Sequence, residues 1–139
     1  MTRRGNYSRD RREGTMTFLE NVKKLVAHTI KYTNKKFSKS VRFTLSNRMI
    51  DKAFEIQHLL LLANEILPKD KRSAERRISK QIEALVCCKE FAYYIEVARM
   101  SEQIKTDNEE NYWSSILVSV QRSVGGWHKS DKQRYKHLL

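Results

Sequence analysis

The segment SVRFTLSNRMIDKAFEIQHLLLLANEILP, residues 40–68, carries two separate lines of apolar side chains at helical spacing. The spacing predicts one long helix from Ser40 to Leu67, which Pro68 ends because proline cannot continue a helix. The main line consists of Val41, Leu45, Met49, Ala53, Ile56, Leu60, Ala63 and Leu67. The second line, about 160° around the helix at roughly 100° per residue, consists of Phe43, Ile50, Phe54 and Leu61. Since a bundle helix needs only one buried face, the second line predicts a central helix or a contact between subunits.

Two further helices are predicted beside this segment. The first is expected to begin at Thr17, because Thr17 and Glu20 have the spacing of a capping box, and to end near Lys35–Lys36. The helix that follows the long one is expected to begin directly after Asp70. Its first half is polar and basic, whereas its second half, residues 84–98, is apolar nearly all round. One end is therefore expected in the core or an interface, and the other in solvent.

A fourth helix is predicted from Asp107, which has a capping-box spacing with Glu110. Gly125–Gly126 is expected to end it, because glycine is common at helix C-termini, and Trp127 is expected to cover the bundle end. Short connections favour antiparallel neighbours, so the predicted fold is an all-α, up-down-up-down four-helix bundle. The predicted domains are a flexible basic arm over residues 1–15, the bundle over residues 16–128 and a basic tail over residues 129–139.

The charge of the chain is the main indication of function. Its 139 residues include 28 Lys and Arg against 16 Asp and Glu, a net charge of +12. Residues 1–15 and 128–139 each carry a net +3, which leaves +6 on the part expected to fold. So large a surplus destabilises a compact protein by self-repulsion and is typical of proteins that bind polyanions.

Two clusters hold much of the positive charge in the predicted bundle. Residues 31–48 include six basic residues and no acid, and residues 69–80 include six basic residues against two acids. In an antiparallel bundle the two clusters fall at opposite ends, unless self-association brings them together. Arg42 and Arg48 lie within or beside the apolar line of their helix, so they are not included among the predicted contacts. The predicted phosphate contacts are Lys35, Lys36, Lys39, Arg72, Arg76, Arg77 and Lys80.

No motif in the sequence indicates catalysis. It has no glycine-rich phosphate loop, no Gly-x-Ser-x-Gly elbow and no Cys/His cluster at metal-binding spacing, so no catalytic residue, metal or other cofactor is predicted. Cys87 and Cys88 are adjacent and cannot easily form a disulfide with each other. They are interpreted as reduced core residues of a cytoplasmic protein. The apolar runs are too short for a membrane span.

Two other classes of function remain open. Arg122 and His128 have a spacing similar to that of the Arg and His of HEPN ribonucleases, although the intervening glycine pair is expected to break the helix that would carry both. A protein adaptor that uses its charge to bind an acidic protein surface is the other alternative.

Two stretches together resemble the accessory variability determinant (Avd) proteins of diversity-generating retroelements. FSKSVRFTLSNR (residues 37–48), followed by LLLLANEI (residues 59–66), is similar to the second helix of that family, and SVQRSVGGW (residues 119–127) is similar to its closing helix. The resemblance implies a four-helix bundle assembled as a homopentameric barrel without a catalytic site. It also implies binding to RNA or DNA and a reverse transcriptase partner in mutagenic cDNA synthesis and retrohoming. Bundles of the ribosomal RNA intervening-sequence type share this fold without that role.

Overall fold

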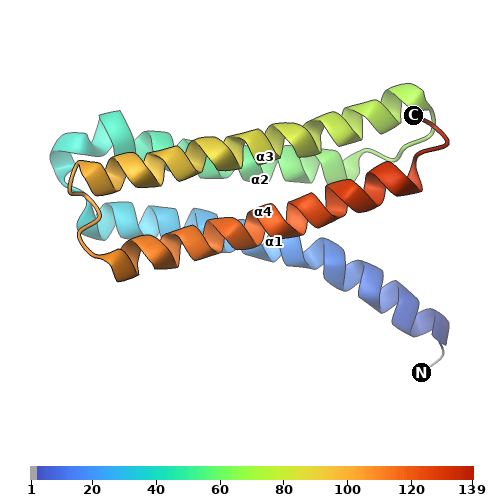
Figure 1. Cartoon of the computed structure of the whole chain (residues 1–139), viewed down its shortest axis with the longest axis horizontal. Helices are drawn as coiled ribbons and strands as arrows, with labels where there is room; N and C mark the ends of the chain where they lie inside the picture. Colours follow the sequence, from blue (N-terminus) through green and yellow to red (C-terminus); the bar gives the residue numbers. More distant parts are fainter. Residues whose placement is uncertain (1–2) are drawn as a thin grey trace.

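The computed structural model describes the backbone of residues 3–139 and the side chains from Thr17 onward. The chain forms α1 (Arg3–Lys36), α2 (Asn47–Glu65), α3 (Lys71–Met100) and α4 (Asp107–Arg134). Successive helices run in opposite directions, and α1 also packs along α4, so the four helices close into a bundle (Figure 1). No β-strand occurs in residues 3–139. The predicted all-α, four-helix architecture is therefore confirmed.

Two short helical turns lead into α2. They are the 3-10 turn η1 (Lys39–Val41) and the π-helical turn η2 (Arg42–Ser46). The Asn47 amide donates to the Arg42 carbonyl, five residues earlier, which widens the helix locally. The helical run from η1 to the end of α2 corresponds to the predicted long helix. It stops before Leu67, which is exposed rather than part of the buried line.

The core is formed by the main apolar line of α2 and one face of each neighbouring helix. The buried members of that line are Leu45, Met49, Ala53, Ile56, Leu60 and Ala63. Trp113 of α4 is fully buried, and its ring contacts those of Tyr32, Phe37 and Phe91. These rings come from α1, the α1–α2 connection and α3, so Trp113 joins three segments to α4.

The first helix begins earlier than predicted. α1 starts at Arg3, so the expectation that Thr17 begins the helix is wrong. Residues 3–16 contain no proline, and the helix continues through the capping-box sequence. The predicted flexible arm is helical from Arg3, while residues 1–2 and the side chains of residues 3–16 lie outside the described part.

The fourth helix differs from the prediction at both ends. Its N-cap is Thr106, whose side-chain oxygen accepts a hydrogen bond from the Glu109 amide at 3.1 Å, so the predicted cap at Asp107 is one residue late. At the other end the helix continues through Gly125–Gly126, and the prediction that this pair ends it is wrong. Neither glycine has a positive φ. Residues 129–134 therefore belong to the bundle and not to a separate tail.

The two ends of the bundle gather different segments. The α1–α2 and α3–α4 connections lie at one end, and the α2–α3 connection lies at the other with the last turns of α4 (Figure 1). The predicted basic clusters are accordingly centred on opposite ends. Taken over the described residues, none of the helices contains an apolar stretch that would reach across a bilayer.

Candidate nucleic-acid interface

Exposed cations gather at the end of the bundle that holds the α2–α3 connection. We call them the basic end surface: Lys69, Lys71, Arg72, Arg76, Lys129, Lys132, Arg134 and Lys136. Residues 65–76 and 129–139 also contain three exposed acids, Glu65, Asp70 and Glu75. Asp70 caps α3 by accepting a hydrogen bond from the Ser73 amide at 2.8 Å, and Glu75 lies 3.9 Å from Lys71 Nζ. The surface therefore keeps a large positive excess.

Half of this surface is not predicted as part of the folded protein. Sequence patterns place residues 129–139 in a tail, because the glycine pair is expected to end the helix before them. In the structure α4 carries three of the four cations in this segment, and the fourth, Lys136, lies two residues beyond the end of the helix. The α4 cations therefore occupy fixed positions beside those of α3, because α3 and α4 pack against each other.

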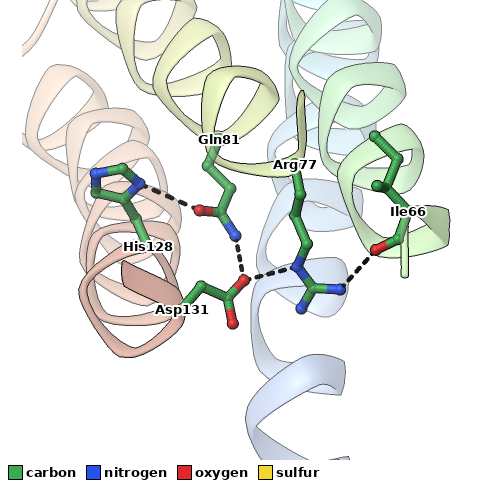
Figure 2. A network of polar contacts seen from close by, with 5 residues as sticks. All are labelled: Ile66, Arg77, Gln81, His128 and Asp131. Carbon is green, nitrogen blue, oxygen red and sulfur yellow. Dashed lines mark hydrogen bonds and ion pairs between the residues drawn. The ribbon is translucent and has the colours of Figure 1, made fainter. Parts of the chain in front are cut away.

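Arg77, predicted as a phosphate contact, points into the bundle (Figure 2). Its Nε donates to Asp131 Oδ2 at 2.7 Å, and its Nη1 donates to the Ile66 carbonyl at 3.0 Å. Arg77 is buried and Asp131 is fully buried. The prediction for Arg77 is therefore wrong, because its guanidinium neutralises a core carboxylate and satisfies a carbonyl at the C-terminus of α2.

Two more polar side chains extend this contact across the α3–α4 interface. Gln81 Nε2 donates to the same Asp131 oxygen at 2.7 Å, and Gln81 Oε1 lies 3.1 Å from His128 Nδ1. An amide oxygen only accepts, so Nδ1 carries the proton in this contact. Burial, followed by the charge of Lys132, lowers the pKa of His128 below 6.5. We call Arg77, Gln81, His128 and Asp131 the polar network.

Aromatic rings enclose the Arg77 guanidinium. Its Cζ lies 5.1 Å from the ring centroid of Trp127 and 5.6 Å from that of Tyr135. Trp127 also stacks on Phe18 of α1, with 4.3 Å between the ring centroids. The last turns of α4 are thus held to both α1 and α3, which explains why the helix continues past the glycine pair.

The other predicted contacts at this end differ in accessibility. Arg72 and Arg76 are exposed on the first turns of α3. Lys80 is half-buried, and its Nζ lies 2.9 Å from Glu83 Oε2, so its charge is partly balanced within the chain. Arg72 and Arg76 are therefore the stronger candidates for phosphate contact.

The predicted contacts Lys35, Lys36 and Lys39 are exposed at the opposite end. Lys36 lines a hollow of about 830 Å³ together with Arg99 and Lys105. This hollow lies where α1 and α3 end, and cations there are favoured by the helix dipoles without any ligand. Arg99 Nη2 is also paired with Asp107 Oδ1 at 2.8 Å. The structure therefore does not bring the seven predicted contacts together.

The residues predicted for subunit contact lie on the outside of α2. Phe43 is 80% exposed, Phe54 and Leu61 are about half exposed, and Ile50 is partly buried. A further exposed apolar line, which sequence analysis does not identify, runs along α3. It consists of Ile82, Val86, Tyr93, Val97 and Met100. The bundle thus carries apolar side chains that its own core does not cover.

The pair considered for ribonuclease activity does not face a common cleft. Arg122 and His128 are six residues apart on one continuous helix, which turns their side chains about 120° from each other. Arg122 is exposed, whereas His128 is directed to Gln81 of α3. Within the described residues no three or more His, Cys, Asp or Glu side chains are placed to hold a metal ion.

Cys87 and Cys88 are free and buried, as predicted for core residues. Burial, together with the negative charge of Glu55, raises the pKa of Cys87 to about 11. Burial raises the pKa of Cys88 to about 12. Both thiols are therefore protonated and unreactive at neutral pH.

A four-helix bundle with a strongly basic end is the class of protein that the geometry defines. Comparison of the chain with models of protein families, with curated proteins and with solved structures finds no match.

Proposed function

We propose that this protein is a nonenzymatic nucleic-acid-binding protein that contacts the phosphate backbone of RNA or DNA through the basic end surface. The observation that supports this proposal most directly is the joining of cations from α3 and α4 at one end of the bundle, with few acids between them. Contacts of this kind go to phosphates, so binding depends strongly on salt and weakly on sequence. Lys35, Lys36 and Lys39, at the other end, remain candidates for a second, weaker contact.

We further propose, from the resemblance to the Avd proteins, that it acts as an accessory to a reverse transcriptase of a diversity-generating retroelement and assembles as a homopentamer. The two exposed apolar lines support self-association. Ile50 borders a groove with α1 residues Thr33 and Asn34, so the α2 line lies toward α1. On α3, Cys87 lies beside Glu55 of α2 and therefore marks the side of α3 that faces α2. The exposed apolar line of α3 points roughly 120° away from Cys87 around the helix axis. Two different faces on opposite flanks fit a head-to-tail ring, whereas a two-fold dimer needs one self-complementary face.

A salt titration tests the binding proposal. The variant Arg72→Gln, Arg76→Gln, Lys129→Gln and Lys132→Gln removes four charges from the basic end surface. Affinity for a short RNA–DNA duplex, measured by fluorescence anisotropy between about 50 and 200 mM salt, is expected to fall. The slope of log K against log salt is expected to flatten by about 0.9 for each phosphate that the variant no longer neutralises.

The matched control neutralises four exposed cations elsewhere on the bundle, Lys24, Lys31, Lys89 and Arg122. It has the same net charge as the test variant. An equal fall in affinity in both variants would show that only overall charge matters and would reject the basic end surface as the site. No salt-dependent binding by the wild-type protein would favour the adaptor alternative, for an acidic protein partner. Cleavage of the RNA that His128→Ala abolishes would favour the ribonuclease alternative.

A further inference from the structure

The cations that α4 contributes to the basic end surface follow a weak point in the helix. Gly125 and Gly126 precede Lys129 and Lys132, and glycine is a poor residue in the middle of a helix. A Cβ built on either glycine meets nothing within 4 Å, so packing inside the chain gives no reason for glycine there. Without other contacts, the part of α4 that follows the pair is the part most prone to fray.

The polar network opposes such fraying together with the stacking of Trp127 on Phe18. Asp131 lies between Lys129 and Lys132 in the sequence but is fully buried, and Arg77 and Gln81 both donate to it (Figure 2). Of the interactions between α3 and the end of α4, this is the one that joins two opposite full charges. Arg77 also donates to the carbonyl of Ile66, the residue that follows α2, so one guanidinium joins the ends of α2, α3 and α4.

We propose that Arg77 and Asp131 are positioning residues for nucleic-acid binding: their buried ion pair holds the last turns of α4 against α3, so that the cations of both helices meet the phosphate backbone as one rigid surface. This inference rests on the proposed function. The positive charge of Arg77 suggests direct contact with phosphate. Under this inference Arg77 instead affects phosphate binding only indirectly, by holding α4 in place. It also makes Lys129, Lys132 and Arg134 phosphate contacts whose contribution depends on a residue that never touches the ligand.

The variant Asp131→Asn separates positioning from simple charge. It removes a negative charge beside a basic surface, so electrostatics alone predicts tighter binding of a polyanion. Without the charge-assisted pair the end of α4 is released, so positioning predicts weaker binding. The two explanations thus predict changes of opposite sign. If the three α4 cations are released, the salt slope is expected to flatten by as much as about 3, at about 0.9 for each neutralised phosphate.

A double-mutant cycle tests whether Asp131 acts through the α4 cations. Lys129→Gln with Lys132→Gln is expected to flatten the slope by about 2 in the otherwise wild-type protein. The same pair is expected to have less than half that effect in the Asp131→Asn background, since those cations no longer hold their positions.

Arg77→Lys is a second, independent test, because it keeps the charge but not the planar fork that binds Asp131 and Ile66 together. If Arg77 contacts phosphate, Arg77→Lys is expected to leave the slope of log K against log salt unchanged. If Arg77 is a positioning residue, the slope is expected to flatten.

Hydrogen exchange keeps the test decisive when a variant is less stable. Amides of residues 127–135 are expected to exchange faster in Asp131→Asn, while those of residues 84–98 keep their protection and report an intact bundle. Should Asp131→Asn fail to fold, Gln81→Leu provides the test, because it keeps the ion pair between Arg77 and Asp131 and removes the two hydrogen bonds that Gln81 forms with Asp131 and His128. Under the proposal it weakens binding less than Arg77→Lys does.

The outcomes are distinguishable. Wild-type protein that shows no salt-dependent binding rejects the proposed function itself, and the inference with it. Wild-type protein that binds, together with an Asp131→Asn variant that binds as tightly or more tightly and with an additive cycle, overturns the positioning role alone. Weaker binding by Asp131→Asn, a non-additive cycle and faster exchange over residues 127–135 support it.

Discussion

Replacing the glycine pair of α4 by alanine is expected to stabilise the protein. Both glycines have helical backbone without a positive φ, and an added Cβ at either position meets nothing within 4 Å. The gain from alanine is therefore the full difference in helix propensity, about 0.8–1.0 kcal/mol at each position. Adjacent residues on a helix do not face each other, so the two gains are expected to add to about 1.5–2 kcal/mol.

Urea unfolding at a fixed protein concentration measures this change. With an m-value of about 2 kcal/mol/M, the double variant Gly125→Ala, Gly126→Ala is expected to raise the midpoint by roughly 0.8–1 M. The control is Ala27→Gly at an exposed position of α1, where the reverse exchange is expected to lower stability by about 1 kcal/mol. If the glycine variants lose stability while the control behaves as expected, then α4 does not run through the pair as one helix. The α4 cations would then not hold fixed positions in the basic end surface.

Three further predictions concern other parts of the molecule. Glu102 follows Ser101, the C-cap of α3, and has φ 65°, a conformation that costs a non-glycine residue about 1 kcal/mol or more, so Glu102→Gly is expected to raise the free energy of unfolding in urea by about that amount. Burial, and then the charge of Lys31, holds the pKa of His28 below 6.5, so unfolded protein takes up a proton more readily. Stability is therefore expected to fall as the pH drops below about 6.5, and thermal melts of His28→Gln should show a smaller fall. On the apolar lines, Phe54→Ser and Tyr93→Ser are each expected to lower the solution mass measured by light scattering, whereas unchanged mass in both would exclude these faces from self-association.

Local sequence patterns predict well the features that local interactions decide. The main line of α2 is buried over most of its length because its periodicity matches a helix face. Asp70 is expected to precede the third helix, and it forms a complete capping box with Ser73. The core of the bundle does not use the second apolar line of α2, because Phe43, Phe54 and Leu61 of that line are exposed.

Features that depend on distant partners escape such patterns. Gly125–Gly126 is a strong local stop signal, but Trp127 stacked on Phe18, more than 100 residues away in sequence, outweighs it. Asp131 looks like a solvated acid in a basic tail, because its partner Arg77 is 54 residues distant. A signal for Arg77 is nevertheless present in the sequence. Its spacing places it on one helix face with the buried residues Ala74, Gln81, Ala84 and Cys88, where an exposed phosphate contact is not expected.

The use of an ion pair rather than an apolar contact at the end of α4 also has a physical rationale. Desolvating Arg77 and Asp131 costs free energy that their attraction only offsets, so apolar residues of similar volume would hold the helix about as firmly. Apolar contacts, however, tolerate small shifts along a helix, whereas Asp131 accepts two donors at 2.7 Å and only one axial position of α4 satisfies both. Under the proposed function, cations at a defined axial position would match phosphates at fixed spacing. The buried pair fixes the axial position of α4 at the end of the bundle where α3 and α4 both present positive charge to solvent.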